Sequence, residues 1–420
     1  MDPPPSSSLA EEERLGSFLL RAAARDSRRS QLGHNGQVSV ARLPFGLTDD
    51  ALAAAMSEED PGSLAAASRM RAHYGPGLAA AALSQATLRR QAKAKFGEAA
   101  VQMFFTRAGL EQATRPEVAD HHASRFLGAG MHTVIDLGCG IGSDSMAFAR
   151  AGLEVMAVDV DPETAAVAQA NLAGWAEVIC ADANEVVEQL ITPGVALFCD
   201  PARRNDHGRL WRVEDFQPRW STITRLLDGE QAAGVKLGPA LPHSLIPDAA
   251  EAEWITHRGE TVEAGLWAGP GATPGRRSAL IMPDARLVVT AAPPLAVRDL
   301  GRYIYEPAGA VIRAGAIAEL GAQLGAGLLD PQVAYLTSDR LCSTPFAAGF
   351  EVRQRLPFHL KALRSWVREA EIGVVEIKKR GIDIDPAQLR KRLRLAGPNS
   401  ATVVISRTPK GALAAVVERV

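Results

Sequence analysis

Asp136 precedes three glycines, Gly138, Gly140 and Gly142, in the stretch DLGCGIG, where a glycine occupies every second position. Glycine has no Cβ, so a ligand can approach the backbone closely and the chain can bend through positive φ angles. A helical pattern, SDSMAFARAG, begins directly afterwards. The N-terminus of a helix offers free N–H groups and the positive end of its dipole. These features together predict a ligand-binding turn.

Two ligands suit such a turn: the pyrophosphate of a dinucleotide and the amino-acid end of S-adenosylmethionine. The spacing of the glycines favours the second, because the dinucleotide fingerprint is G-x-G-x-x-G and this sequence reads G-x-G-x-G. The stretch resembles motif I of the class I S-adenosylmethionine-dependent methyltransferases. The resemblance implies that Asp159 binds the ribose hydroxyls and that Asp182 meets the adenine amine. The alternative is a glycine turn with unrelated acids at the strand ends.

A fourth acid, Asp200, lies in the sequence VALFCDPARR. Asp200-Pro201 resembles the D/N/S-P-P-x motif of methyltransferases that act on exocyclic amines of bases. The lone pair of such an amine is delocalised into the ring, and acceptors for its N–H hydrogens would aim that lone pair at the methyl group. Ala202 and Arg203 depart from the motif, which usually ends in an aromatic residue. Arg203 and Arg204 could stack on a base, hold a phosphate or form a solvated pair, and Asp200 could instead cap its loop.

The elements that must position these residues alternate between strand and helix. We predict strands at residues 133–137, 155–159, 177–180, 195–199 and 234–237, with helices between them, which implies a parallel sheet covered by helices. Two longer strands, EWITHRGETVEAGLWAG and RRSALIMP, should form the antiparallel end of the same sheet. The predicted fold class is α/β, with a Rossmann-like class I methyltransferase sheet.

The length of the chain predicts more than one domain, because 420 residues exceed what one core usually holds. We expect a helical region at 1–95, the methyltransferase domain at 96–290 and an α+β domain at 300–420. The four cysteines form no CxxC pair and no cluster with histidine, so we expect neither a metal site nor disulfides, and a cytoplasmic location. No apolar run is long enough to span a membrane. The sequence does not indicate an oligomeric state.

The segment that leads into the glycine turn contains aromatic, basic and capping residues. Its layout is similar to that of the cap guanine-N2 methyltransferases, which implies that Phe104, Phe105 and Thr106 form an edge near the cofactor; the phenylalanines could equally be core. Thr114 and Pro116 predict the start of a helix. His121 and His122 have no acid or cysteine at a telling spacing, so we expect them to cap or pack. Cys139 and Cys199 should be apolar fillers, and nothing around Cys342 supports a nucleophile.

The last part of the chain resembles the THUMP-like domain that is fused to such methyltransferases in bacteria. The resemblance rests on YIYEPAGAVIRAG and VVEIKKRGIDIDPAQLRKRLRL, and it implies RNA binding. Lys378, Lys379 and Arg380 belong to a local excess of positive charge in a chain of net charge −2. We expect these basic residues to surround an exposed helix that begins at Asp385-Pro386 and could hold phosphates. A solvated basic helix is the alternative.

The sequence as a whole predicts an S-adenosylmethionine-dependent methyltransferase that acts on an exocyclic purine amine, guanine N2, in tRNA or rRNA. We expect S-adenosylmethionine as cofactor, RNA as partner, and neither metal nor membrane. Two alternatives stay open. One is a methyltransferase for a small molecule or a protein, and the other is a non-catalytic RNA-binding protein that keeps the cofactor fold.

Overall fold

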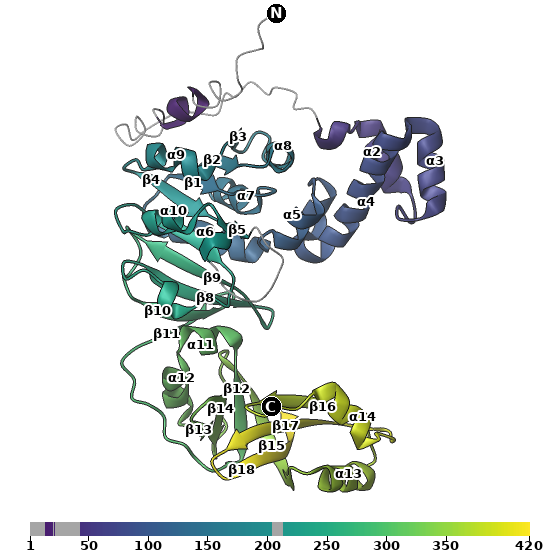
Figure 1. The fold of residues 1–420 in the computed structure, drawn as a ribbon, viewed down its shortest axis with the longest axis vertical. Coiled ribbons are helices and arrows are strands. Elements are labelled where there is room, and N and C mark those ends of the chain that lie inside the picture. The colour runs from purple at the N-terminus through teal and green to yellow at the C-terminus, as the bar shows by residue number, and fades with distance from the viewer. Residues whose placement is uncertain (1–12, 20, 22–42, 204–212) are drawn as a thin grey trace, which may run out of the picture. The chain divides into compact units, whose positions relative to one another are not determined.

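The computed structural model describes residues 13–19, 21, 43–203 and 213–420 (Figure 1). The backbone of Arg203 and Glu214 is described but their side chains are not. By its internal contacts the chain divides into two compact units. One comprises Met1–Leu237, Leu241–Glu251 and Gly265–Gly275, and the other comprises Gly238–Ala240, Ala252–Ala264 and Arg276–Val420.

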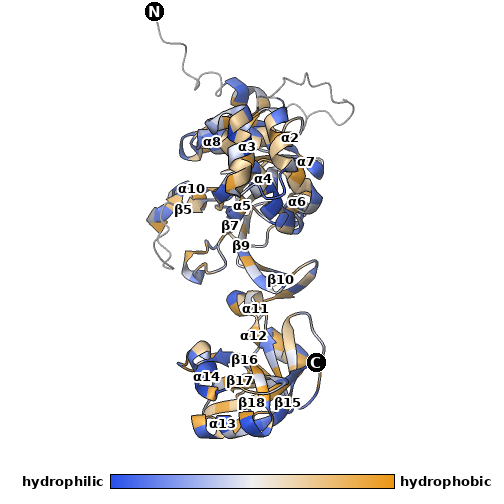
Figure 2. Ribbon diagram, turned by 90° about the vertical axis from the view of Figure 1, so that its right-hand side faces the viewer, coloured by the Kyte–Doolittle hydropathy of each residue, from blue (hydrophilic) through white to orange (hydrophobic). Residues whose placement is uncertain are grey.

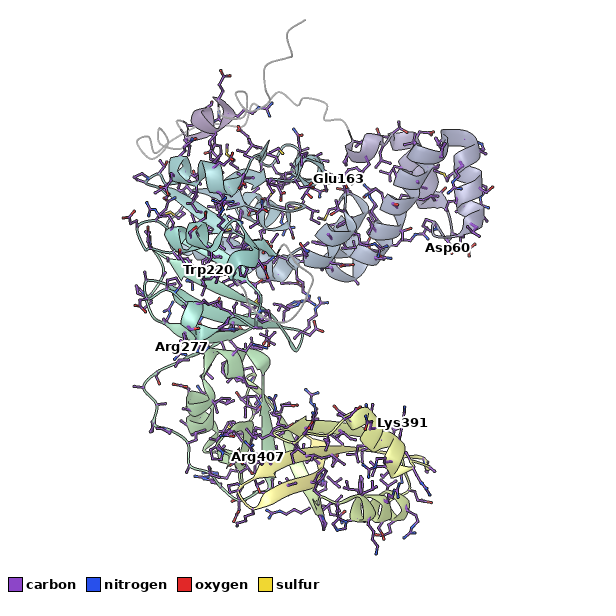
Figure 3. All side chains as sticks on the ribbon, in the orientation of Figure 1. Asp60, Glu163, Trp220, Arg277, Lys391 and Arg407 are labelled. Carbon is purple, nitrogen blue, oxygen red and sulfur yellow. The ribbon has the colours of Figure 1, made fainter. Side chains whose placement is uncertain are left out.

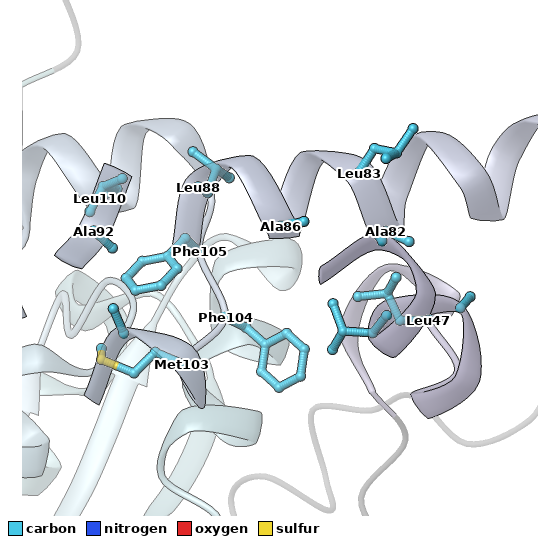
Figure 4. Close-up of a cluster of buried hydrophobic side chains, with 14 of the residues drawn as sticks. Leu47, Ala82, Leu83, Ala86, Leu88, Ala92, Met103, Phe104, Phe105 and Leu110 are labelled. Carbon is cyan, nitrogen blue, oxygen red and sulfur yellow. The ribbon is translucent and has the colours of Figure 1, made fainter. Parts of the chain in front are cut away.

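The helices α2 (Asp49–Ser57), α3 (Leu64–Tyr74) and α4 (Pro76–Phe96) follow the alanine-rich part of the sequence, as predicted. Alanine is the strongest helix former, and the side chains of Thr48 and Ser63 cap α2 and α3 by accepting backbone N–H bonds. The buried faces share one hydrophobic core with Phe104 and Phe105 (Figure 4). Ile141 of the glycine turn and Val167 belong to the same core. The helical region is therefore packed against the segments that surround the turn.

Among the described residues, nine strands form the first sheet, in the order β11-β10-β8-β9-β7-β4-β1-β2-β3. Their bounds are β1 (Thr133–Leu137), β2 (Glu154–Asp159), β3 (Glu177–Cys180), β4 (Val195–Cys199), β7 (Ala233–Leu237), β8 (Glu251–His257), β9 (Glu260–Ala268), β10 (Arg277–Ile281) and β11 (Ala285–Val288). The pairs β1–β2, β1–β4, β2–β3 and β4–β7 are parallel. The five predicted strands and the parallel sheet are confirmed, and the carboxyl ends of these strands share one edge.

The single long strand predicted for EWITHRGETVEAGLWAG is wrong. The chain turns at Arg258 and Gly259, which have φ angles of 50° and 83°, so β8 and β9 are neighbouring strands of a hairpin. A two-residue turn with both φ values positive suits the right-handed twist of paired strands. The strand predicted for RRSALIMP is β10, which pairs parallel with β8 and antiparallel with β11.

The helices between the strands follow the predicted alternation. They are α5 (Arg107–Gln112), α6 (Pro116–Gly128), α7 (Ser143–Arg150), α8 (Pro162–Asn171), α9 (Ala183–Leu190) and α10 (Trp220–Leu226). The short pieces are the 3-10 helices η1 (Pro44–Gly46), η2 (Gly97–Val101), η3 (Val213–Asp215) and η4 (His243–Leu245), and the strand pair β5 (Ala202–Arg203) and β6 (Phe216–Gln217). Pro116 begins α6 as predicted, but its N-cap is Arg115. The prediction of Thr114 as the cap is wrong, because its hydroxyl donates to the side chain of Asp144 instead.

The second sheet lies in the C-terminal part of the chain and has the order β13-β14-β12-β15-β18-β17-β16 among the described residues. Its strands are β12 (Tyr303–Pro307), β13 (Gly327–Asp330), β14 (Val333–Ser338), β15 (Ala347–Pro357), β16 (Ile372–Arg380), β17 (Asn399–Thr408) and β18 (Gly411–Arg419). The helices of this part are α11 (Gly309–Ala314), α12 (Ile317–Leu324), α13 (Leu360–Glu369) and α14 (Pro386–Leu393). The predicted α+β character is confirmed.

Two hydrophobic clusters stabilise the second sheet. Leu363, Trp366 and Leu393 of α13 and α14 pack on one face with residues of β15, β16, β17 and β18. The other cluster joins β12 to β15, β17 and β18 and contains Ile304 and Tyr335. In Figure 2 both α13 and α14 carry hydrophilic as well as hydrophobic residues, as expected for helices with one buried face. None of the helices in the described residues is long and apolar enough to cross a membrane.

Candidate active site

The three glycines of the turn after β1 serve three different purposes. Gly138 has a φ of 78°, and a Cβ built on it would lie 2.9 Å from the carbonyl oxygen of Asp200. Gly142 has a φ of 85°, and its Cβ would press on Leu172. A Cβ on Gly140 would meet no atom within 4 Å. Gly138 and Gly142 therefore allow close packing, whereas Gly140 leaves space for a ligand.

A cavity of about 730 Å³ opens at the carboxyl ends of the parallel strands. Six predicted site residues line it: Gly138, Gly140, Asp159, Asp182, Asp200 and Pro201. The other two predicted cofactor residues, Asp136 and Gly142, are not among its lining residues. Thus the structure brings together the ends of β1, β2, β3 and β4, which the sequence separates.

Asp159 and Asp182 are oriented by backbone hydrogen bonds. The N–H groups of Gly140 and Asp161 donate to the two carboxylate oxygens of Asp159, at 2.9 and 3.0 Å. Burial raises the pKa of Asp159, and these two hydrogen bonds oppose that rise. Asp182 caps α9 by accepting from the N–H of Asn184 at 2.9 Å. Asp182 is thus held at the cavity wall by the start of its own helix, and Asp159 by its own loop and by the glycine turn after β1.

Asp136 lies below the glycine turn and is only 1% exposed. The hydroxyl of Ser145 donates to its Oδ2, while its Oδ1 is buried and has no hydrogen-bond partner among the described residues. Burial, with the neighbouring charge of Asp144, raises the pKa of Asp136 to about 8. Asp136 is therefore protonated at neutral pH, and a positively charged ligand nearby would favour its ionised form.

A chain of polar side chains that the sequence did not predict runs through the wall of the cavity. Lys236, on β7, forms an ion pair with Oδ2 of Asp200 and donates to Thr114 Oγ1 at 2.8 Å. The Thr114 hydroxyl donates to Asp144, whose other oxygen lies 2.8 Å from His122 Nδ1. Five side chains from different parts of the sequence are therefore connected.

His122 is packed in the core and also has an acid partner. Packing is confirmed, since the ring is fully buried and lies 5.1 Å from the ring of Phe198. The sequence shows no acid at a telling spacing from His122, yet Asp144, 22 residues away in sequence, is adjacent to it in space. Burial alone would raise the pKa of Asp144, but bonding to His122 and the charges of His122 and Lys236 hold it below its usual range. A lysine near the end of the buried strand AGVKL was a signal that the sequence offered for Lys236.

The segment before α5, residues 104–106, contributes partly to the hydrophobic core and partly to the cavity. Phe104 and Phe105 are buried in the hydrophobic core, which confirms the core alternative, whereas Thr106 lines the cavity. The side chains of Gln85 and Asn171 each form two hydrogen bonds with the backbone of this segment. Asn171 also donates to the carbonyl of Ile141, at 2.9 Å, and so links the segment to the glycine turn.

The basic residues of the second sheet differ from the prediction. Lys378, Lys379 and Arg380 lie on β16, and therefore the expectation that they surround a helix is wrong. Lys378 and Arg380 are partly buried, pair with Glu306 and lie over the rings of Phe350 and Tyr335. Lys379 is exposed. The predicted helix start is confirmed in α14, where Asp385 caps the first turn and Pro386 follows.

Several other predicted residues have simple surroundings. Cys139 and Cys199 are buried, and burial raises the pKa of both thiols well above the usual range, as expected for fillers. Arg204 lies outside the described residues, and of Arg203 only the backbone is described. Within the described part of the chain, no group of three His, Cys, Asp or Glu residues could hold a metal ion.

The cavity fits S-adenosylmethionine on three observations. Its volume lies in the range of small-molecule sites. Acids at the ends of β2 and β3 offer acceptors for hydroxyl and amine groups. The space beside Gly140 marks the end of the cavity that suits the amino-acid portion of the ligand.

Comparisons with known proteins agree with this geometry. Family models match residues 134–192 (methyltransferase domain), 347–419 (THUMP domain-like) and 49–92 (a domain of unknown function). Proteins from two strains of Mycobacterium tuberculosis, each named an uncharacterized S-adenosylmethionine-dependent methyltransferase, are 36% identical over 363 residues. Those matches cover 83% of this chain and 98% of each relative.

A solved structure resembles the fold of nearly the whole chain. The protein, from Porphyromonas gingivalis W83 and named as a candidate methyltransferase, superposes with a TM-score of 0.70 over 88% of this chain and 98% of its own. At 20% identity this likeness concerns the fold alone. The relatives and the matched domains carry the assignment: the chain belongs to the class I S-adenosylmethionine-dependent methyltransferases, takes S-adenosylmethionine as its cofactor, and has a THUMP-like domain over residues 347–419.

Proposed function

We propose that this methyltransferase modifies an exocyclic purine amine, guanine N2, in tRNA or rRNA. The observation that carries the proposal is the position of Asp200-Pro201, which lines the same cavity as Gly138 and Gly140. An acid at the end of the fourth strand, next to the glycine turn, suits a substrate that presents N–H donors. The target base and the RNA are the proposed part; methyl transfer itself follows from the family.

Asp200 would accept an N–H hydrogen of the amine. That bond favours a pyramidal nitrogen with its lone pair directed at the methyl group, and the side chain would then take the proton that the nitrogen loses. The cofactor, when bound, supplies an activated methyl group on a positively charged sulfur and leaves as a neutral thioether. Pro201 restricts the loop, and the carbonyl of Asp200 already lies against Gly138.

The residues that would hold the cofactor are the acids and glycines of the first three strand ends. In this proposal Asp159 accepts from the ribose hydroxyls and Asp182 from the adenine amine, while the backbone around Gly138 and Gly140 contacts the amino-acid portion. Asp136 would act from below the turn, through its unpartnered oxygen. Gly142 would contribute by letting Leu172 pack behind the turn.

Support for RNA comes from the solvent-facing side of α13 and α14, together with the neighbouring strand β16. We call the exposed cations there the basic face; they are Lys361, Arg368, Lys379, Arg390, Lys391, Arg392 and Arg394. No ion pair joins any of them to an acid within the described part of the chain, and Lys391 of α14 is labelled in Figure 3. Exposed cations without acid partners suit phosphates. Lys378 and Arg380 would contribute less, because Glu306 already pairs with them.

For Arg203 and Arg204, which follow the Asp200-Pro201 motif, we keep the proposal of a contact with a base or a phosphate.

The test is transfer of a labelled methyl group from S-adenosylmethionine to total RNA from a strain that lacks the gene. Wild type and Asp200→Ala are compared, and binding of S-adenosylhomocysteine by each is measured by calorimetry. We expect ribonuclease-sensitive label with wild type only, N2-methylguanosine after nucleoside digestion, and product binding by both proteins. General acid–base contributions of this kind are typically about 100- to 10,000-fold in rate.

Other outcomes separate the alternatives. Label in protein or in small molecules, and none in RNA, would replace RNA by another substrate class. Label in a different nucleoside would keep RNA and reject guanine N2. RNA binding without any methyl transfer, unchanged by Asp200→Ala, would support the non-catalytic alternative.

A further inference from the structure

Lys236 and Asp200 occupy matching positions on neighbouring strands. In the parallel pair of β4 and β7, Cys199 lies opposite Val235, so the next residues, Asp200 and Lys236, also face each other. The Lys236 ammonium forms its ion pair with Asp200 inside the cavity wall, where its side chain is 13% exposed and that of Asp200 is 31% exposed. The register of the sheet thus places the Lys236 ammonium beside the Asp200 carboxylate, which the proposed reaction needs.

The polar chain behind Lys236 limits where its ammonium can lie. Its bond to Thr114 Oγ1 is 2.8 Å long, and the same hydroxyl donates to Asp144. Because a hydroxyl has one hydrogen, Thr114 accepts from Lys236 while it donates to Asp144, and this fixes the direction of the chain. Asp144 is anchored in turn by the fully buried His122.

The charges around the cavity floor would otherwise be unbalanced. Asp136, Asp144 and Asp200 come from β1, α7 and the end of β4, and the charges of Asp144 and Asp200 both disfavour the ionised form of Asp136. Lys236 acts in the opposite direction on Asp136 and Asp144. His122 of α6 acts in the same direction as Lys236 on Asp144. On the other side of Lys236 lies Lys95 of α4, whose pKa is lowered to about 8 by burial and by the charges of Arg115 and Lys236.

We propose that Lys236 is a positioning residue for methyl transfer: it holds the Asp200 carboxylate ionised and in one orientation, while Thr114, Asp144 and His122 hold Lys236. This inference rests on the proposed function for the role of Asp200, but the geometry of the chain does not depend on which substrate is methylated. A purely structural ion pair would contribute to stability and would leave the orientation of Asp200 and its ionisation during turnover unaffected.

The main test replaces Lys236 by Met, which keeps the length of the aliphatic stem and removes the charge. We expect a crystal structure of Lys236→Met to show the Asp200 carboxylate in a different orientation, and S-adenosylhomocysteine to bind within about threefold of wild type. We expect methyl transfer to fall about 100-fold, as for a catalytic group that is misplaced by a small distance. The acid limb of the pH profile should move to higher pH, because Asp200 then lacks the neighbouring positive charge that favours its ionised form.

Two further variants keep the inference testable if Lys236→Met does not fold. Thr114→Val removes only the hydroxyl that holds Lys236, and we expect about a tenfold loss of turnover with the acid limb shifted in the same direction. Lys236→Arg keeps the charge but not the geometry. Compared with Lys236→Met, it should therefore return the pH profile closer to that of wild type than it returns the rate of methyl transfer. The matched control is Lys93→Met, which removes an exposed lysine that pairs with Glu98 on the surface and should behave as wild type.

The outcomes distinguish this inference from the proposed function. If wild type labels no RNA, the proposed function fails, and the crystal structure still decides the inference. An unchanged Asp200 orientation in Lys236→Met would overturn it. Equal methyl transfer and equal pH profiles in wild type, Lys236→Met and Thr114→Val would overturn it as well, while leaving the RNA proposal intact.

Discussion

The two sheets of this chain treat their charged side chains in opposite ways. In the first sheet the charges gather at the carboxyl ends of β1, β2, β4 and β7, where they are buried or half-buried. Among them, Asp200 and Lys236 are linked through Thr114 to Asp144 and His122. In the second sheet, Lys378 and Arg380 are paired with Glu306, whereas the cations of the basic face are exposed and have no acid partners within the described part of the chain.

This difference indicates which function suits the cavity of the first sheet and which suits the basic face of the second. A few buried charges in fixed geometry suit a reaction, because low exposure strengthens each interaction and holds it in one orientation. Many exposed and unpaired cations suit a polyanion, whose binding depends on salt and on the number of contacts. Substitutions should therefore have large, specific effects in the first region and small, graded effects in the second.

The largest effect is expected for the buried Asp136, and it concerns the pH dependence of folding stability. Its pKa is about 8 in the folded chain and about 4 when unfolded, so between these pH values the folded state holds a proton that the unfolded state has lost. Folding stability should therefore fall as pH rises, by about 1.4 kcal/mol per pH unit, and level off above about pH 8. Asp136→Asn removes this term, and from pH 6 to about pH 9.5 it should gain roughly 3 kcal/mol relative to wild type.

Urea denaturation of both proteins between pH 6 and pH 9.5 measures this difference. Asp49→Asn, in the exposed first turn of α2, is the control, and its difference from wild type should not change over this range. A constant difference between Asp136→Asn and wild type at every pH would show that Asp136 is ionised throughout, and would remove the contrast between the buried and the exposed charges.

The second prediction concerns the close approach of the β1 turn to the β4 loop. Gly138→Ala would combine an unfavourable φ of 78° with a Cβ only 2.9 Å from the carbonyl of Asp200. We expect the Asp200 loop to move and methyl transfer to fall by about 100-fold. The rate of methyl transfer measures this, together with binding of S-adenosylhomocysteine.

A matched control separates the displacement from the backbone strain. Gly152 has a similar positive φ, of 91°, but a Cβ there would meet nothing within 4 Å. Gly152→Ala should destabilise the fold by about 1–2 kcal/mol and leave turnover intact. Equal losses of turnover in both variants would mean that strain alone matters and that the contact with Asp200 does not.

The same contrast explains what the sequence could predict. The parallel strands were predictable because each is a short apolar run bounded by glycine or acid, and the acids that end them are neighbours at one edge by topology alone. Asp159, Asp182 and Asp200 were therefore found. The hairpin at Arg258-Gly259 was missed because the apolar pattern continues on both sides of a two-residue turn.

The polar chain could not be predicted, because its members are joined only by the tertiary structure. Lys236 and Thr114 are 122 residues apart, and Asp144 and His122 are 22 apart, with no periodicity that links them. The misplacement of Lys378, Lys379 and Arg380 has a different cause. A run of three cations hides the alternation of a strand in which Lys378 and Arg380 share one side and Lys379 does not.

The smallest expected effect concerns the basic face. Replacing Arg390, Lys391 and Arg392 of α14 by Gln should weaken RNA binding about tenfold at moderate salt and reduce the slope of log affinity against log salt by about one per charge. α14 itself should stay folded, because Leu393 still packs in the core and Asp385 still caps the first turn. Fluorescence anisotropy with total tRNA from the strain without the gene, at several salt concentrations, measures both quantities.

The control for this prediction is a cation that is exposed but already paired. Arg353 forms ion pairs with Glu351 and Glu418, so its charge is compensated within the protein and Arg353→Gln should change the salt slope by much less than one. If Arg353→Gln and the α14 variants change the slope equally, net charge and not the basic face governs binding. If the α14 variants leave the slope unchanged while wild type still methylates RNA, the cavity of the first sheet recognises the substrate without the basic face, and the division of labour between the two regions is wrong.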